Sequence, residues 1–123
     1  MKKITLTIIS LFFSLQSQSA TCPDPATSSL QWGKIPPPWI ADPFSDHDAQ
    51  GDKNNRFIRA NILVAGVGRG IVCNYQNSIG YYSIWWPISV KIPARTDYNW
   101  LEGNMGYACS ISADACVFYP AKE

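Results

Sequence analysis

Hydrophobic and polar residues alternate with a period of two over residues 57–64. Such alternation is typical of a strand with one buried face. It assigns two sets of side chains to opposite faces: Ile58, Ala60, Ile62 and Val64 to one, and Phe57, Arg59, Asn61 and Leu63 to the other. Further strand-like runs cover 71–76 and 81–92, separated by glycine-rich or polar turns. Short strands at this spacing, with no amphipathic helix, predict an all-β fold, a small antiparallel β-sandwich or barrel.

The pattern is different upstream of this region. Residues 21–56 are rich in Pro, Ser, Asp and Asn and follow neither a helical nor an alternating period. Three consecutive prolines at 36–38 favour an extended polyproline conformation. The segment nevertheless has more apolar side chains than a free linker, namely Leu30, Trp32, Ile35, Trp39, Ile40 and Phe44. We therefore expect 21–56 to be an extended, proline-rich segment that wraps around the antiparallel β domain of residues 57–123 and forms one domain with it.

The first 20 residues have the layout of a secretory signal peptide. Two lysines precede an apolar stretch over 4–15, and small polar residues follow up to Ala20. The apolar stretch is shorter than the roughly 20 residues of a membrane-spanning helix. Residues 1–20 are therefore expected to be removed, by cleavage after Ser19 or Ala20. We expect the mature domain to have no membrane span and to reach the periplasm or the exterior.

Composition and charge narrow the class of partner. The 123 residues have room for one domain, 13% are aromatic and only 15% are charged, which favours a well-packed domain over a disordered one. Without Lys2 and Lys3, eight basic residues stand against nine acidic ones. This balance gives no electrostatic footprint for nucleic acid. We expect a monomer whose partner is a protein or a glycan.

Four cysteines lie in the expected mature chain, and an even number predicts two disulfides in an exported domain. Residues 106–119 read as a hairpin whose register places Cys109 opposite Cys116. Directly opposed residues are close to the span of a disulfide, which leaves Cys22 for Cys73. A zinc site is not expected, because there is no CxxC spacing and the sole histidine is far from each cysteine in sequence. No other cofactor is expected.

Three motifs resemble chemical sites, and each lacks a required part. The glycines of 66–70 do not open a helix and no Lys-Ser or Lys-Thr follows them, which favours a hairpin turn over a phosphate loop. Residues 46–54 match a calcium loop at several positions, but Phe57 stands where the final glutamate belongs, so a solvated acidic loop is favoured over weak calcium binding. His47 is the only imidazole, and no GxSxG motif accompanies it. The sequence predicts a non-catalytic protein, and a hydrolase with His47 as its only imidazole is the remaining alternative.

The aromatic run that begins at Tyr81 is the strongest candidate for a binding surface. If every second residue of this run faces the core, then Tyr81, Ser83 and Trp85 point the other way. An exposed stripe of Tyr and Trp side chains is a contact surface for sugar rings or for a protein. We expect Tyr81 and Trp85, with Arg69 in a neighbouring turn, to contact the ligand or partner.

Two alternatives to this interpretation stay open. In the first, the proline-rich segment covers the same face and buries Trp85 against Trp32 or Trp39. In the second, the protein is an inhibitor or immunity-type protein that blocks another enzyme's active site with loop 66–70, since a preorganised domain loses little entropy on docking. The leading prediction is a secreted or periplasmic, disulfide-stabilised binding protein.

Several stretches of the chain resemble a known family. They are CPDPATSSLQWGKIPPPW from Cys22, RFIRANILVAGVGRGIVCNY, SIGYYSIWWP and GYAC. The chain resembles small exported proteins of unknown function from gamma-proteobacteria, some of them intracellular pathogens. The resemblance implies export and a virulence-associated role at the host or envelope interface, and it assigns no catalytic residue.

Overall fold

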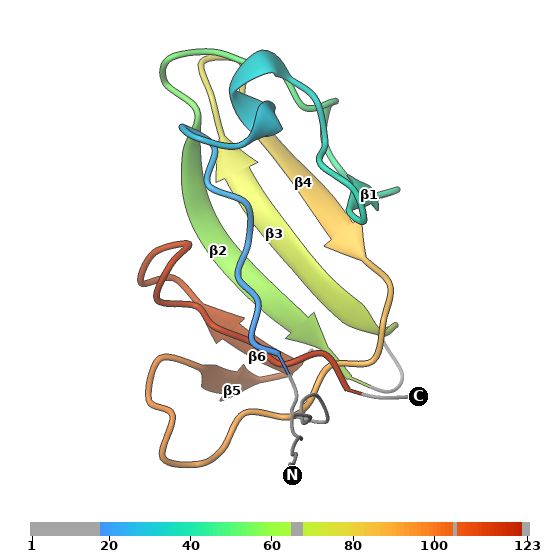
Figure 1. Cartoon of the computed structure of the whole chain (residues 1–123), viewed down its shortest axis with the longest axis vertical. Coiled ribbons are helices and arrows are strands. Elements are labelled where there is room, and N and C mark those ends of the chain that lie inside the picture. The colour runs from blue at the N-terminus through green and yellow to red at the C-terminus, as the bar shows by residue number, and fades with distance from the viewer. Residues whose placement is uncertain (1–17, 65–67, 105, 122–123) are drawn as a thin grey trace, which may run out of the picture.

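The structure, a computed structural model, describes residues 18–64, 68–104 and 106–121 (Figure 1). One short 3-10 helix, η1 (Ser29–Trp32), precedes six antiparallel strands in a single sheet of order β1-β4-β3-β2-β6-β5. The strands are β1 (Ile40–Ala41), β2 (Arg56–Leu63), β3 (Gly70–Gln76), β4 (Tyr81–Trp86), β5 (Leu101–Gly103) and β6 (Gly106–Cys109). The predicted all-β antiparallel fold is confirmed. The expected signal peptide lies almost entirely outside the described residues.

The second layer of the fold is made of extended chain, and not of strands. The N-terminal segment crosses one face of β2 and β3, and the C-terminal segment lies beside it (Figure 1). The two segments are joined by the bridge between Ala20 and Phe118, with N–O distances of 2.8 and 2.9 Å. A sandwich or a closed barrel is not confirmed, because the pairings among the described strands leave β1 and β5 as the two edges.

The core lies between this covering layer and one face of the sheet. Ala60, Cys73 and Ile84 are direct neighbours across β2, β3 and β4, and all three are fully buried. From the covering layer, Trp39 packs against Trp86 and Phe118, with ring centroids 5.5 and 6.1 Å apart. Burial of these apolar side chains is the main stabilising term for so small a domain.

A β-bulge corrects the predicted phase of β2. The register with β3 shifts between Phe57 and Arg59, so Ile58 is the extra residue. A bulge reverses the alternation on one side of it. Phe57 therefore packs on Tyr75 in the core layer, at a centroid distance of 6.0 Å, whereas Ile58 lies with Arg59 on the opposite face. The prediction that Ile58 shares a face with Ala60 and Ile62, and Phe57 a face with Arg59, is therefore wrong.

Both predicted disulfides are present, Cys22–Cys73 and Cys109–Cys116. The Cys109–Cys116 bridge was predicted from a hairpin of two strands, and the second of these strands does not form. Strand β6 pairs with β2 along one edge and with β5 along the other, so neither edge is available to residues 116–119. Instead, a tight turn in which the Cys116 N–H donates to the Ser112 carbonyl returns the chain and closes the bridge.

Two core tyrosines give a testable pH dependence. Tyr75 and Tyr82 stack at 5.2 Å, and their hydroxyls donate to the Pro23 carbonyl and to Asn55 Oδ1. Burial raises the pKa of both phenols, and that of Tyr82 rises from 10.0 to about 12. The folded state thus retains the phenol proton that the unfolded chain loses above pH 10, and stability falls as the pH rises from there.

We expect the free energy of unfolding, measured in urea, to decrease as the pH rises from about 10 to about 12, and to decrease less in Tyr82→Phe. Tyr98→Phe is the matched control, because this side chain is 82% exposed. An equal pH slope in the two variants would show that Tyr82 titrates no later in the folded protein than in the unfolded chain.

Candidate functional site

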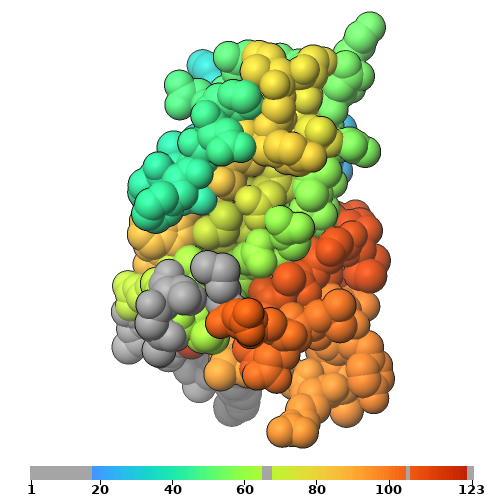
Figure 2. Space-filling view, turned by 180° about the vertical axis from the view of Figure 1, so that it is seen from behind, coloured from blue at the N-terminus to red at the C-terminus, as the bar shows by residue number. Residues whose placement is uncertain are grey.

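The face of the sheet opposite the core is open over its central strands. Strand β4 alternates as predicted: Tyr82 and Ile84 are buried in the core, and Tyr81, Ser83 and Trp85 lie on the other face. Seen from behind, side chains of β2, β3 and β4 reach the surface between a ridge formed by the segment around residue 40 and the C-terminal part of the chain (Figure 2). We call this surface the open face.

Trp85 is half-buried on the open face, but neither Trp32 nor Trp39 covers it. Trp39 belongs to the core, and Trp32 is 70% exposed, so the alternative in which they cover Trp85 is wrong. The Trp85 indole N–H donates to the Arg69 carbonyl over 2.9 Å. This contact requires a glycine at position 70, where φ is +108° and a Cβ would crowd the indole nitrogen. The indole is therefore fixed in place.

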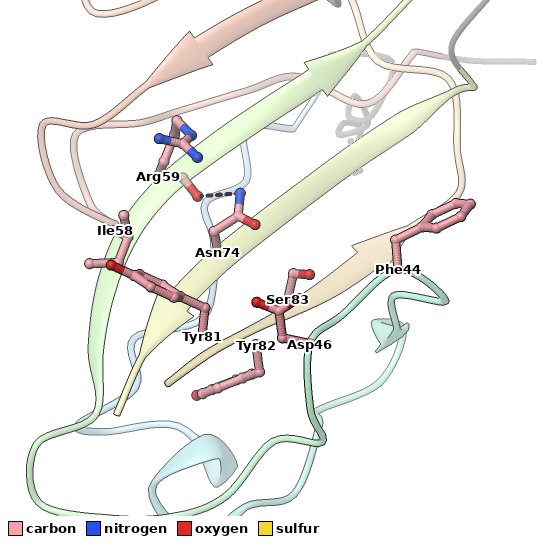
Figure 3. Close-up of a pocket in the computed structure, with 8 residues that line it drawn as sticks. All are labelled: Phe44, Asp46, Ile58, Arg59, Asn74, Tyr81, Tyr82 and Ser83. Atoms are coloured by element: carbon pink, nitrogen blue, oxygen red, sulfur yellow. Dashed lines mark hydrogen bonds between the residues drawn. The ribbon is translucent and has the colours of Figure 1, made fainter. Parts of the chain in front are cut away.

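A hollow of about 400 Å³ opens next to Tyr81 (Figure 3). Tyr81 and Phe44 stand on opposite sides of it, and Ser83 and Asn74 lie between them. It is lined mainly by polar groups, and its lining residues are Phe44, Asp46, Ile58, Arg59, Asn74, Tyr81, Tyr82 and Ser83. Tyr81 is 50% exposed, so its ring is available to a ligand in the hollow.

The segment that follows β1 forms one wall of the hollow and is tied to β4. Asp42 accepts a hydrogen bond from the Ser83 hydroxyl over 3.0 Å, and the Ser45 hydroxyl accepts one from the Ser83 N–H over 2.9 Å. The Asp42 side chain also accepts from the N–H of Phe44, in a turn with Pro43 at its second position. These hydrogen bonds fix the turn, and the Phe44 side chain on it is 90% exposed.

The opposite wall is a small network of side chains on β2 and β3. Asn61 Oδ1 accepts from Arg59 Nε over 3.3 Å and from Asn74 Nδ2 over 3.0 Å. The register explains the juxtaposition, since Arg59 and Asn74 are direct partners and Asn61 is the next residue of β2 on the same face. The network holds the guanidinium at the edge of the hollow.

The structure brings together two of the three predicted site residues and ties the third to them. Tyr81 and Trp85 share the open face, and Arg69 is joined to Trp85 through its backbone. The residues missed were those of the neighbouring strands, above all Arg59 and Asn74. The alternation of residues 57–64 placed Arg59 on the face opposite Ala60 and Ile62, but the sequence did not show which strands would lie beside it.

The acidic loop at 46–54 does not gather its side chains. Asp46 lines the hollow, whereas Asp52 accepts hydrogen bonds from the N–H groups of Asn54 and Ser78, which lower the pKa of its carboxyl group. Within 18–64, 68–104 and 106–121, no cluster of three or more His, Cys, Asp or Glu could hold a metal ion. Asp46 and Asp52 of the calcium template thus lie in different surroundings.

The imidazole of His47 packs against the turn at Gly80. Its Nε2 is buried, and it has no hydrogen-bond partner among the residues that the structure describes. No hydroxyl or carboxylate is thus hydrogen-bonded to this nitrogen.

The fold and the open face define a class: a small, disulfide-stapled domain with one antiparallel sheet, covered on one face by extended chain and hollowed on the other. Residues 16–119 match the family described as "Protein of unknown function (DUF3757)", and the chain belongs to this family. Comparison with curated proteins and with solved structures gives no match. In the described part of the chain, no helix is long and apolar enough to cross a membrane.

Proposed function

We propose that this protein is an exported, non-catalytic binding protein whose open face recognises a glycan. The observation that carries the proposal is the hollow beside Tyr81, where an exposed aromatic ring meets several polar groups. An aromatic face packs against the apolar side of a sugar ring, and neighbouring amide, hydroxyl and carboxylate groups can bind its hydroxyls.

The shape of the site favours a glycan over a protein. A volume of about 400 Å³ lies within the range of sites for small ligands. Hydrogen bonds join β4 to the segment after β1 on one side of the hollow. On the other side, the Asn61 network joins side chains of β2 and β3. A preorganised concave site of this kind loses little entropy on binding.

The disulfides support the exported location. Both bridges are formed, and the described residues have no free cysteine, which is consistent with an oxidising compartment. Together with the expected signal peptide at 1–20, this supports our proposal that the protein is exported to the periplasm or the exterior and acts at the envelope or host interface. The inhibitor alternative depends on loop 66–70, of which residues 66 and 67 lie outside the described residues.

Replacing Tyr81 by Ala is expected to weaken glycan binding about tenfold or more, since truncating a central aromatic anchor removes most of its binding energy. A glycan array probed with the oxidised domain would identify a ligand, and calorimetry would measure its affinity for both variants. Tyr98→Ala is the matched control, because Tyr98 is more exposed than Tyr81 and does not line the hollow.

Binding that is lost equally in the two variants, or kept in both, would show that the hollow is not the site. If the array shows no ligand and the domain binds only a protein through Tyr81, the glycan proposal is wrong and the open face is a protein-docking surface.

A further inference from the structure

The hollow on the open face has a single cationic side chain among its described lining residues, that of Arg59. Arg59 is exposed, and the side chain that it contacts is neutral: its Nε–H donates to Asn61 Oδ1. No carboxylate forms an ion pair with it in the described part of the chain. Asp46 also lines the hollow, but its carboxylate is not paired with Arg59. A guanidinium at a concave polar site that is not paired with a carboxylate of the protein is available to a negatively charged ligand group.

The geometry of the network specifies the kind of anion. Because Nε is occupied by Asn61, the two terminal nitrogens of the guanidinium are left for a ligand. These nitrogens form a planar fork that matches the two oxygens of a carboxylate. We infer that the glycan bound by this protein carries a carboxylate, as in a uronic or sialic acid, and that Arg59 binds this group.

The other lining groups orient such a ligand. Asn61 Oδ1 also accepts from Asn74 Nδ2. The side-chain oxygen of Asn74, Oδ1, remains available as an acceptor for a ligand. Asp46 on the segment after β1, and Ser83 on the neighbouring strand β4, add acceptors on the other side of the hollow. Acceptors suit sugar hydroxyls, and the negative charge of Asp46 disfavours a carboxylate there. The acid group is thus directed to Arg59, and the hydroxyls to the opposite wall, with Tyr81 beside the ring.

This inference rests on the proposed function. Pairs of acidic and neutral sugars test the inference separately from the proposed function. The oxidised domain is tested on an array of oligosaccharides that end in sialic or uronic acid, with their neutral counterparts. The acidic oligosaccharide that binds best is then compared with its own methyl ester, which keeps the sugar and removes the charge. We expect the ester to bind about tenfold or more weakly, the loss typical of a hydrogen bond to a charged group.

Variants of the arginine provide the second comparison. Arg59→Gln is expected to bind the acid no better than the wild type binds the ester, and Arg59→Lys is expected to recover only part of the affinity, because a lysine lacks the fork. Arg95→Gln is the control, since Arg95 is exposed in the loop between β4 and β5 and does not line the hollow. Thermal unfolding of each variant confirms that it is folded.

The outcomes are distinguishable. Equal affinity for acid and ester, or full binding by Arg59→Gln, overturns the inference but leaves the proposed function intact if Tyr81 is still required. Binding of neutral glycans alone has the same meaning. An array on which neither acidic nor neutral glycans bind overturns both.

Discussion

Replacing Cys22 and Cys73 together by Ala is expected to lower the free energy of unfolding by about 4 kcal/mol. The bridge closes a loop of 51 residues, and a long loop loses much conformational entropy in the unfolded chain when it is closed. The bridge also joins the covering segment, through Cys22, to the central strand β3, through Cys73. Both cysteines are fully buried. Domains of this size are stable by only about 5–15 kcal/mol, so urea unfolding should show a large shift of the midpoint.

The second bridge is the internal control for this prediction. Cys109–Cys116 closes a sequence separation of only 7, and the same entropy argument gives about 2.5 kcal/mol for its removal. The double variant of this pair should therefore unfold at a higher urea concentration than the Cys22/Cys73 variant. The reverse order would show that loop closure is not the dominant contribution of these bridges.

Changing Gly106 to Ala is expected to cost about 3 kcal/mol of stability, because strain and a steric clash act together. Gly106 begins β6 with φ at +130°, a conformation that side chains with a Cβ rarely adopt. A Cβ there would overlap the carbonyl oxygen of Ile62 on β2. To relieve this overlap, β6 would have to move away from β2, which would break the pairing at Leu63.

Gly103 provides the matched control, because it is the register partner of Gly106 on β5. A Cβ at position 103 has no atom within 4 Å and no unusual φ, so Gly103→Ala should change stability by no more than about 0.5 kcal/mol. Chemical denaturation of the two variants measures the difference. Equal stability would mean that the close approach of β6 to β2 is not required for folding.

The candidate site depends on contacts between residues far apart in the chain. Ser83 is bound by Asp42 and Ser45, which lie 41 and 38 residues before it. The Asn61 network joins β2 to β3 across 13 residues. Variants of Asp42 or Ser45 should therefore change the shape of the hollow, even though neither residue lines it.

The local pattern of the sequence was sufficient for several features. The alternation of β4 placed Tyr81 and Trp85 on the face opposite Tyr82 and Ile84, because successive side chains of a strand point in opposite directions. Cysteine number gave two bridges, and their pairing was right even though one strand of the assumed hairpin is absent. A disulfide requires only that two Cβ atoms approach closely, and a tight turn at Ser112 achieves this as well as a paired strand would.

By itself, then, the sequence determined the all-β class, the bridges and the face on which the aromatic stripe lies, since each depends on neighbours along the chain or on the redox chemistry of cysteine. Only the tertiary structure decided the bulge at Ile58, which face of the sheet the extended chain covers, and the hollow with Arg59 at its edge. These features depend on strand order and register, which are set by the packing of segments distant in sequence. An alternating pattern tells which side chains share a face of one strand, and the fold decides which strands complete that face.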